Sequence, residues 1–396
     1  MTRLLVLQIL LSGVPVITAA ESPSTIRIAT YNVAFHRNEA GKLSHDLHSG
    51  THRQTRQIAE VIQRIQPDIL LLNEFDYDDQ SRALDLFEKL YLGRPQADQK
   101  AIEFAHRYVG TVNTGRPTRF DLNRDGKFGG PADAVGFGHH EGQYGMAVLS
   151  KFPFSAGQTR TFQQFLWADM PGALLPVNPS DESSYYSPEE LQILRLSSKS
   201  FWDLPILVDG PSGSTRSLHL LCAHPTPPVF DGPEDRNGRR NHDELRMIAD
   251  YLDPQKSDYL VDDNGQPGGL NESLPFVIAG DLNADPMDGD SLPGAIDQLL
   301  NHRRVDSNWI PSSEGSITST PKPLQNSSSQ RGNPAHHTAS FGRNKPRNYR
   351  VDYLLPSREL VVVNGGVFWP RPGEPGGQAV TASDHRLVWL DMRWRQ

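Results

Sequence analysis

The sequence contains a single cysteine, Cys222, among 396 residues. One cysteine cannot close a disulfide within the chain, and no Cys-x-x-Cys motif is present to bind zinc. Cys222 lies in the apolar run of residues 218–223, so we expect a buried, unreactive thiol. Stability must therefore come from a hydrophobic core, with bound ions as a further source.

Positive charge is also scarce. The chain has 39 Lys and Arg against 47 Asp and Glu, and its formal net charge is -8 at pH 7. This disfavours a protein that binds nucleic acid through a globally basic surface, although a local basic patch is still allowed. The motifs Gly-x-Ser-x-Gly and His-Glu-x-x-His are absent, which disfavours a serine hydrolase and a zinc protease.

Long apolar runs are absent after the first part of the chain. Arg3 is the only charged residue before Glu21, residues 4–17 are uncharged and largely apolar, and the small residue Ala20 ends the segment. Such a layout is typical of a secretory signal peptide that is cleaved after Ala20. The apolar run is short for a bilayer-spanning helix, so we expect a secreted or periplasmic protein, with an uncleaved anchor as the alternative.

Two predicted strands near the start of the chain end on polar side chains. Residues 26–33 alternate in polarity and carry Asn32, and residues 67–74 form an apolar run that finishes on Glu74. Residues 51–66 between them carry apolar side chains at helical spacing. An ionised Glu beside an apolar run needs a partner, because its desolvation is costly. This order predicts an α/β fold with a site along one rim of a sheet.

The most informative stretch is residues 275–286. An apolar run predicts a buried strand over residues 276–279, and Gly280 is expected to turn the chain sharply before Asp281 and Asn283. These two side chains are two residues apart, so in an extended chain they share one side and can hold one metal ion, water or phosphate. A turn rich in Asp and Asn after a core strand is the alternative interpretation.

Three later predicted strands carry polar side chains in the same way. Proline cannot continue a sheet, so a histidine that prolines follow is left at the rim. A buried Asp within a strand needs a partner. The residues are His224 at the end of residues 218–224, Asp352 within residues 350–355, and Asp384 and His385 before residues 387–392.

Loops are expected to be long, because the chain has 33 Gly and 31 Pro. Residues 116–140, 158–199 and 311–350 are predicted as insertions, and the last of them is expected to cross the mouth of the site. A helix is predicted up to about Leu252, with Asn241 as its N-terminal cap.

One loop has the front half of a calcium-binding pattern. Asp121, Asn123 and Asp125 occupy alternate positions and Gly126 is the sixth residue, as in an EF-hand loop. The closing acid is missing, because position twelve is Ala132. The segment is therefore interpreted either as a structural Ca²⁺ site or as an ordinary turn.

The polar positions together supply carboxylates, amides and imidazoles. Oxygen ligands suit Mg²⁺, Mn²⁺ or Ca²⁺ better than zinc. A metal ion, an acid that activates water, and groups that stabilise charge on oxygen are what hydrolysis of a phosphate ester requires. The set is Asn32, Glu74, His224, Asp281, Asn283, Asp352, Asp384 and His385.

The order of the segments that carry these residues resembles the endonuclease/exonuclease/phosphatase superfamily, which includes DNase I, exonuclease III-type repair nucleases, sphingomyelinases and inositol polyphosphate 5-phosphatases. The resemblance implies a DNase I-like, four-layer α/β/β/α sandwich of two mixed, largely antiparallel β-sheets flanked by helices. It also implies one catalytic domain over residues 21–396, with the site at one end of the sheets. The segments are Thr30-Tyr-Asn32, Leu72-Asn-Glu74, Ala223-His224, Gly280-Asp-Leu-Asn283, Arg350-Val-Asp-Tyr353 and Ser383-Asp-His385.

The resemblance implies that Mg²⁺ or Mn²⁺ binds at the active site. Glu74 would be the main ligand with Asn32 beside it, and Asp384 would bind metal or support His385. Repair nucleases usually have Tyr where His224 stands, and His at this position is closer to DNase I and the sphingomyelinases.

Catalytic roles follow from the same resemblance. Asp281 would orient and deprotonate the attacking water, and Asn283 would contact the phosphate or a second ion. His224 and His385 would stabilise the charged transition state, and Asp352 would hold the tautomer of His385.

These observations lead to a first hypothesis of a secreted or periplasmic, metal-dependent phosphodiesterase. Its substrate would be nucleic acid, a phospholipid headgroup or a small phosphate ester, and we expect a monomer without an obligate protein partner. A phosphomonoesterase is the second hypothesis. A calcium-dependent binding module on a non-catalytic scaffold is the third.

Overall fold

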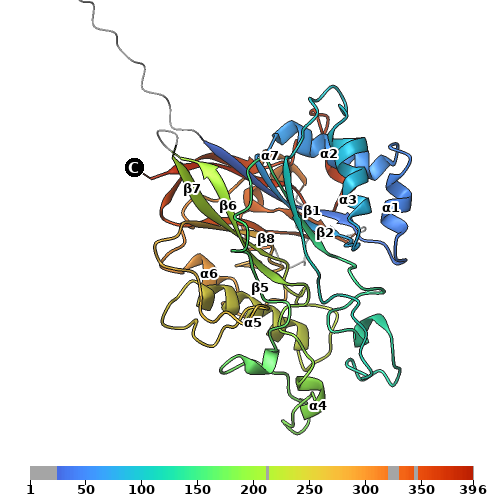
Figure 1. Ribbon diagram of the computed structural model, residues 1–396. Coiled ribbons are helices and arrows are strands. Elements are labelled where there is room, and N and C mark those ends of the chain that lie inside the picture. Colours follow the sequence, from blue (N-terminus) through green and yellow to red (C-terminus); the bar gives the residue numbers. More distant parts are fainter. Residues whose placement is uncertain (1–24, 211–213, 320–329, 343–346, 396) are drawn as a thin grey trace, which may run out of the picture.

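The computed structural model describes residues 25–210, 214–319, 330–342 and 347–395. The predicted signal peptide, residues 1–20, lies outside these ranges. Two β-sheets stack on one another, and helices lie on the outer side of the stack (Figure 1). None of the helices in the described ranges combines the length and apolar character needed to cross a membrane.

The first sheet has six strands in the order β12-β13-β1-β2-β4-β3. β1 and β2 are parallel, and the other neighbours in this sheet are antiparallel. Its strands are β1 (Ile26–Phe35), β2 (Ile69–Phe75), β3 (His106–Val109), β4 (Met146–Ser150), β12 (Leu360–Val367) and β13 (Val388–Trp394).

The second sheet has five strands in the order β11-β8-β7-β6-β5. Again one central pair, β7 and β8, is parallel and the other neighbours are antiparallel. Its strands are β5 (Arg160–Thr161), β6 (Phe201–Asp209), β7 (Thr215–Ala223), β8 (Phe276–Asp281) and β11 (Asp352–Pro356). A separate hairpin pairs β9 (Ala339–Phe341) with β10 (Arg347–Tyr349).

Helices cover the outer face of each sheet. The apolar side of α2 packs on the first sheet through Ile58 and Ile62, and α5 packs on the second through Leu245 and Ile248. Short helices complete these outer layers. The helices are α1 (Lys42–Leu47), α2 (Arg53–Ile65), α3 (Arg82–Phe87), α4 (Pro188–Leu191), α5 (Arg236–Tyr251), α6 (Asp297–Leu300) and α7 (Glu314–Ser319), with a π-helix at Glu88–Leu92.

A third core lies between the sheets. Ile28 and Leu71 of the first sheet and Leu220 and Val277 of the second belong to one buried cluster. Strands with apolar side chains on both faces become buried on both sides, which explains their nearly continuous apolar sequences. The predicted α/β/β/α sandwich of mixed, largely antiparallel sheets is therefore confirmed.

Two predictions about the elements were wrong. Asn241 does not cap a helix, because α5 begins at Arg236 and Asn241 is buried within it, where its Nδ2 donates to the carbonyls of Thr226 and Leu282. Residues 311–350 are more than a loop, because α7, β9 and β10 lie in their described part.

Gly280 was predicted to turn the chain, but it lies within a strand. It lies inside β8 with φ 149°, paired with Tyr353 on one side and Ala223 on the other. A Cβ atom there would lie 1.9 Å from the carbonyl oxygen of Ala223. Glycine is therefore required because the backbone of β7 approaches closely.

Candidate active site

Most of the predicted polar residues meet at one end of the sandwich, where parallel strands of both sheets finish. β1 and β2 carry Asn32 and Glu74 at this end, and the chain leaves β7 at His224. β8 ends on Asp281, which pairs in register with Asp352 at the start of the antiparallel β11. The tertiary fold thus gathers residues that are far apart in the sequence.

The backbone is unusual at this rim. Glu74 and Asn283 both have positive φ angles, 56° and 53°, although neither is glycine. Ala34 has φ 50°, and the pairing of β1 with β2 shifts register after Asn32. Such conformations cost about 1–3 kcal/mol each and concentrate at functional sites.

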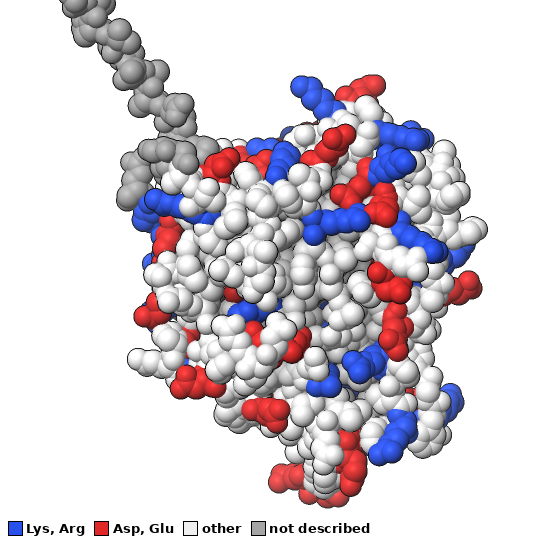
Figure 2. Space-filling model, viewed as in Figure 1, with Lys and Arg blue, Asp and Glu red and all other residues white. Residues whose placement is uncertain are grey.

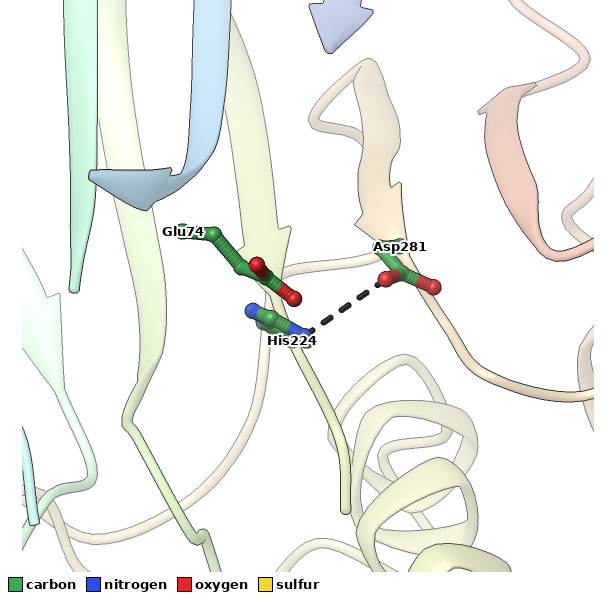
Figure 3. Close-up of side chains that lie close together, drawn as sticks. All are labelled: Glu74, His224 and Asp281. Atoms are coloured by element: carbon green, nitrogen blue, oxygen red, sulfur yellow. Dashed lines mark ion pairs between the residues drawn. The ribbon is translucent and has the colours of Figure 1, made fainter. Parts of the chain in front are cut away.

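Asp281 is the common contact of the site. Asn32 Nδ2 donates to its Oδ2 at 3.0 Å, and the Nε2 atoms of His224 and His385 lie 3.5 Å and 3.6 Å from the same oxygen. Figure 3 shows the carboxylate of Glu74 next to the ring of His224, with Asp281 opposite them. Burial raises the pKa of Asp281 to about 7, although His385 opposes this shift.

His385 is held by a buried carboxylate. Its Nδ1 lies 2.9 Å from Asp352 Oδ2, and Thr338 Oγ1 donates to the same oxygen at 2.7 Å. Burial lowers the pKa of His385, but Asp352 and Asp281 outweigh it and raise this pKa well above its usual value. His385 is therefore a cation near neutral pH, with Nε2 directed at Asp281.

His224 is in the opposite state. Burial, followed by the positive charges of Lys199 and His385, lowers its pKa well below the usual value. Its Nδ1 has no hydrogen-bond partner within the described ranges. A neutral imidazole and an imidazolium thus both lie close to the same oxygen of Asp281.

The residues present fit a hard divalent cation. Glu74, His224 and Asp281 each offer a ligand atom, and these atoms lie within 4.8 Å of one another. Asp281, Asp352 and His385 form a second such group, but Asp352 is already paired with the His385 cation. The first group, with its carboxylates, is the better site for Mg²⁺ or Mn²⁺.

For three predicted residues the contacts in the structure differ from the predicted role or do not test it. The amide of Asn32 donates to Asp281 and accepts from Ala34 N, so the structure gives it a hydrogen-bonding role, and metal ligation stays a prediction. Asn283 donates through Nδ2 to the carbonyl of Pro225. Asp384 is exposed and belongs to neither ligand group among the described residues.

Other residues at the site were not predicted. His36 Nε2 lies 3.4 Å from Glu74 Oε2, and its ring lies 4.6 Å from that of Tyr144. Asn73 is fully buried and links the sheets, since its Oδ1 accepts from Asp281 N and its Nδ2 donates to the carbonyl of Ala223. Asn73 could have been predicted from the sequence, because a polar amide next to an apolar run needs a hydrogen-bond partner when it is buried.

The predicted calcium loop lies apart from these groups. Asp121 accepts from the backbone N–H groups of Asp125 and Gly126, and Asp125 accepts from that of Lys127. The buried Asp133, next to the missing twelfth position, accepts from the N–H groups of Leu122 and Gly130. These bonds are those of an ordinary turn, and the Ca²⁺ site stays a prediction.

The solved structures that align with most of this chain have low sequence identity to it. An endonuclease/exonuclease/phosphatase protein from Beutenbergia cavernae is 18% identical, with a TM-score of 0.49, over 93% of this chain and 72% of its own. TDP2 from Caenorhabditis elegans is 14% identical with a TM-score of 0.43, over 93% and 74%. Sphingomyelinase C from Streptomyces griseocarneus is 12% identical with a TM-score of 0.42, over 93% and 99%.

A comparison with curated proteins found no match. The family model described as Endonuclease/Exonuclease/phosphatase family matches residues 29–385, which are most of the chain and include every residue of the site. This chain therefore belongs to the endonuclease/exonuclease/phosphatase family of phosphoester hydrolases.

Proposed function

We propose that the protein is an exported phosphodiesterase that depends on Mg²⁺ or Mn²⁺. The observation that carries this proposal is the Asp281 carboxylate, which is approached by the neutral His224 and by the cationic His385. The site thus combines a base with a group that stabilises negative charge, next to carboxylates that suit a metal ion.

Asp281 is the proposed base. Its pKa of about 7 lies near working pH, where a carboxylate is both deprotonated in useful amount and strong enough to accept a proton from water. The water gives its proton to Asp281 and attacks phosphorus, the bond to the leaving oxygen breaks, and that oxygen takes up a proton from solvent. Asn32 and His224 keep the carboxylate oriented through Oδ2.

His385 is the proposed stabiliser of charge on the phosphoryl oxygens. Asp352 and Thr338 fix its ring, so little reorganisation is needed when charge develops. A divalent ion held by Glu74 next to Asp281 would supply further positive charge to these oxygens. Asn283 is proposed to contact the phosphate through its amide.

The proposed substrate is a phosphate diester, and the surface charge gives no preference for a long nucleic acid. Figure 2 shows acidic and basic side chains interspersed over the face that it presents, where a continuous basic surface would favour tight binding of a duplex. The net charge of -8 supports the same conclusion. A nucleic acid, a phospholipid headgroup or a smaller diester each supplies the required group.

A substrate panel tests this function. The protein starting at Glu21 would be assayed with Mg²⁺, Mn²⁺ or Ca²⁺ on plasmid DNA, RNA, sphingomyelin, bis-p-nitrophenyl phosphate and p-nitrophenyl phosphate. We expect metal-dependent cleavage of at least one diester and slower cleavage of the monoester. A preference for the monoester would make the protein a phosphomonoesterase, and metal binding without cleavage of any substrate would favour a binding module.

Export is tested separately. The full-length chain would be produced in a bacterium, and the N-terminus of the mature protein would be read by mass spectrometry from the periplasmic and medium fractions. We expect a chain that begins at Glu21. Full-length protein that stays in the cytoplasm would contradict export but would leave the phosphodiesterase proposal in place.

A further inference from the structure

Lys199 is a buried lysine at the end of the sandwich that carries Asp281. Phe201 at the start of β6 pairs with Ala223 at the end of β7, and the strands are antiparallel. Lys199 precedes β6 by two residues, so it lies beside the chain that leaves β7 through His224 and Pro225. Only 6% of Lys199 is exposed.

The backbone on both sides of Lys199 is firmly held. Glu244 of α5 accepts from Ser198 N at 2.8 Å through one carboxylate oxygen and from Thr226 N at 2.6 Å through the other. The carbonyl of Lys199 accepts from Asn113 N at 2.9 Å. The segment is thus fixed against the loop that carries His224, so the position of the lysine is set by the fold.

The ammonium group of Lys199 has no direct partner. Within the described residues its Nζ forms neither an ion pair nor a hydrogen bond. Burial lowers the pKa of Lys199, while the carboxylates of Glu244, Glu74 and Asp281 act in the opposite direction. A largely buried ammonium without a hydrogen-bonded anion is unfavourable, so an anion from outside the chain would stabilise it.

The charges around the site point to the same conclusion. A divalent ion would balance Glu74 and Asp281, and Asp352 is balanced by His385. His224 is neutral. Besides His385, the negative charge of a bound phosphate diester, and the charge that it gains during reaction, then have Lys199 as a second buried counter-charge.

We propose that the Lys199 ammonium binds a non-bridging oxygen of the substrate phosphoryl group and stabilises the charge that develops there. This role rests on the proposed function. A cation whose backbone is already held by the fold requires little reorganisation during the reaction, which is why such groups are effective on phosphoryl transfer.

Two substitutions and a control test the role. Lys199→Met keeps the apolar stem and removes the charge, and Lys199→Arg keeps the charge. Lys151→Met is the matched control, because Lys151 pairs with Asp68 at the opposite end of β2 and β4. For each purified protein we would measure kcat/KM on the best diester, Mn²⁺ affinity, and the affinity for inorganic phosphate with Mn²⁺ present.

We expect Lys199→Met to lower kcat/KM about 10²–10³-fold, as removal of a stabilising donor does. Phosphate affinity should fall about tenfold or more. Mn²⁺ affinity should stay the same or increase, because a repelling charge next to Glu74 and Asp281 is gone. Lys199→Arg should recover part of the loss, and Lys151→Met should match the unchanged protein.

Two results would overturn the proposal. One is an unchanged kcat/KM and phosphate affinity in Lys199→Met. The other is an equal loss of phosphate affinity, Mn²⁺ affinity and melting temperature in both Lys199 variants, which would assign the residue a purely structural role. If the unchanged protein cleaves no phosphate ester, the proposed function fails, and the phosphate measurement alone then decides whether Lys199 binds this anion.

Discussion

At the scale of single residues, one carboxylate oxygen of Asp281 is shared by Asn32 and two histidines in opposite protonation states. The chemistry of the site follows from this arrangement. A buried carboxyl with its pKa near 7 is a poor acid and a useful base, and the fixed imidazolium beside it is available to balance charge on a bound anion.

Removal of either group should abolish most of the activity. We expect Asp281→Ala and His385→Ala each to lower turnover of the best diester by about three orders of magnitude, because each removes a base or a charge-stabilising group. Circular dichroism should show an intact fold in both variants. Turnover close to normal in one of them would remove that residue from the mechanism.

Asp281 should also make the stability of the metal-free protein depend on pH. Its folded pKa of about 7 lies above the ordinary value of 3.8, so the folded state binds the proton more tightly than the unfolded state. The resulting stability is complete below about pH 4 and is lost as the pH rises through about 7.

We therefore expect the melting temperature in EDTA to fall between about pH 4 and 7 and to level off above, with a smaller fall in Asp281→Asn. Differential scanning calorimetry across this range measures both curves. Parallel curves for the two proteins would show that Asp281 ionises normally in the folded state.

Which residues could be predicted depended on their neighbours in the sequence. Glu74, Asp281 and His224 stand out because each follows an apolar run. Lys199 was missed because it lies among serines, where a lysine looks solvent-exposed and no periodicity marks its burial. Protonation states could not be predicted at all, since they depend on which charges the fold brings together.

At the scale of elements, the close approach of β7 and β8 aligns the catalytic rim. Gly280 permits this approach, because any Cβ atom would meet the carbonyl of Ala223. We expect Gly280→Ala to lower the free energy of unfolding by about 3 kcal/mol or more, through overpacking and backbone strain. Urea denaturation measures this change.

Gly265→Ala is the control for backbone strain alone. Gly265 has φ 82° and nothing within 4 Å of an added Cβ atom. Its substitution should cost only about 1–2 kcal/mol, the penalty of a left-handed conformation. Equal losses in the two variants would show that the contact between β7 and β8 is not what requires glycine at position 280.

Element boundaries were predictable where a pattern was strong. The apolar stripe of α2 predicted a helix over residues 51–66, and the helix is Arg53–Ile65. The start of α5 was missed because Arg236 and the residues after it are polar and resemble a loop. This first turn is helical because the rest of α5 packs on the second sheet, which is a tertiary effect.

The calcium loop gives a prediction at the same scale. Asp121→Ala together with Asp125→Ala should lower the melting temperature only when Ca²⁺ is supplied, because a ligand that binds only the folded state stabilises it. The comparison requires melts with Ca²⁺ and with EDTA. Identical melting of both proteins in Ca²⁺ would leave the segment as an ordinary turn.

At the scale of the whole molecule, the sandwich places the ends of two parallel strand pairs, one pair from each sheet, on the same side. The sequence indicated strands that end on polar residues and, through its resemblance to a family, the sandwich itself. It did not indicate which ends would touch, because contacts such as that between Asn32 and Asp281 join residues from different sheets. Such contacts depend on sheet packing, which no local pattern encodes.

The central claim is that this meeting point binds a divalent cation beside Asp281 and His385. Anomalous diffraction from a crystal soaked in Mn²⁺ tests it most directly. We predict a peak at the carboxylates of Glu74 and Asp281 that disappears in Glu74→Ala. Strong anomalous peaks elsewhere, with none at these two carboxylates, would contradict the account.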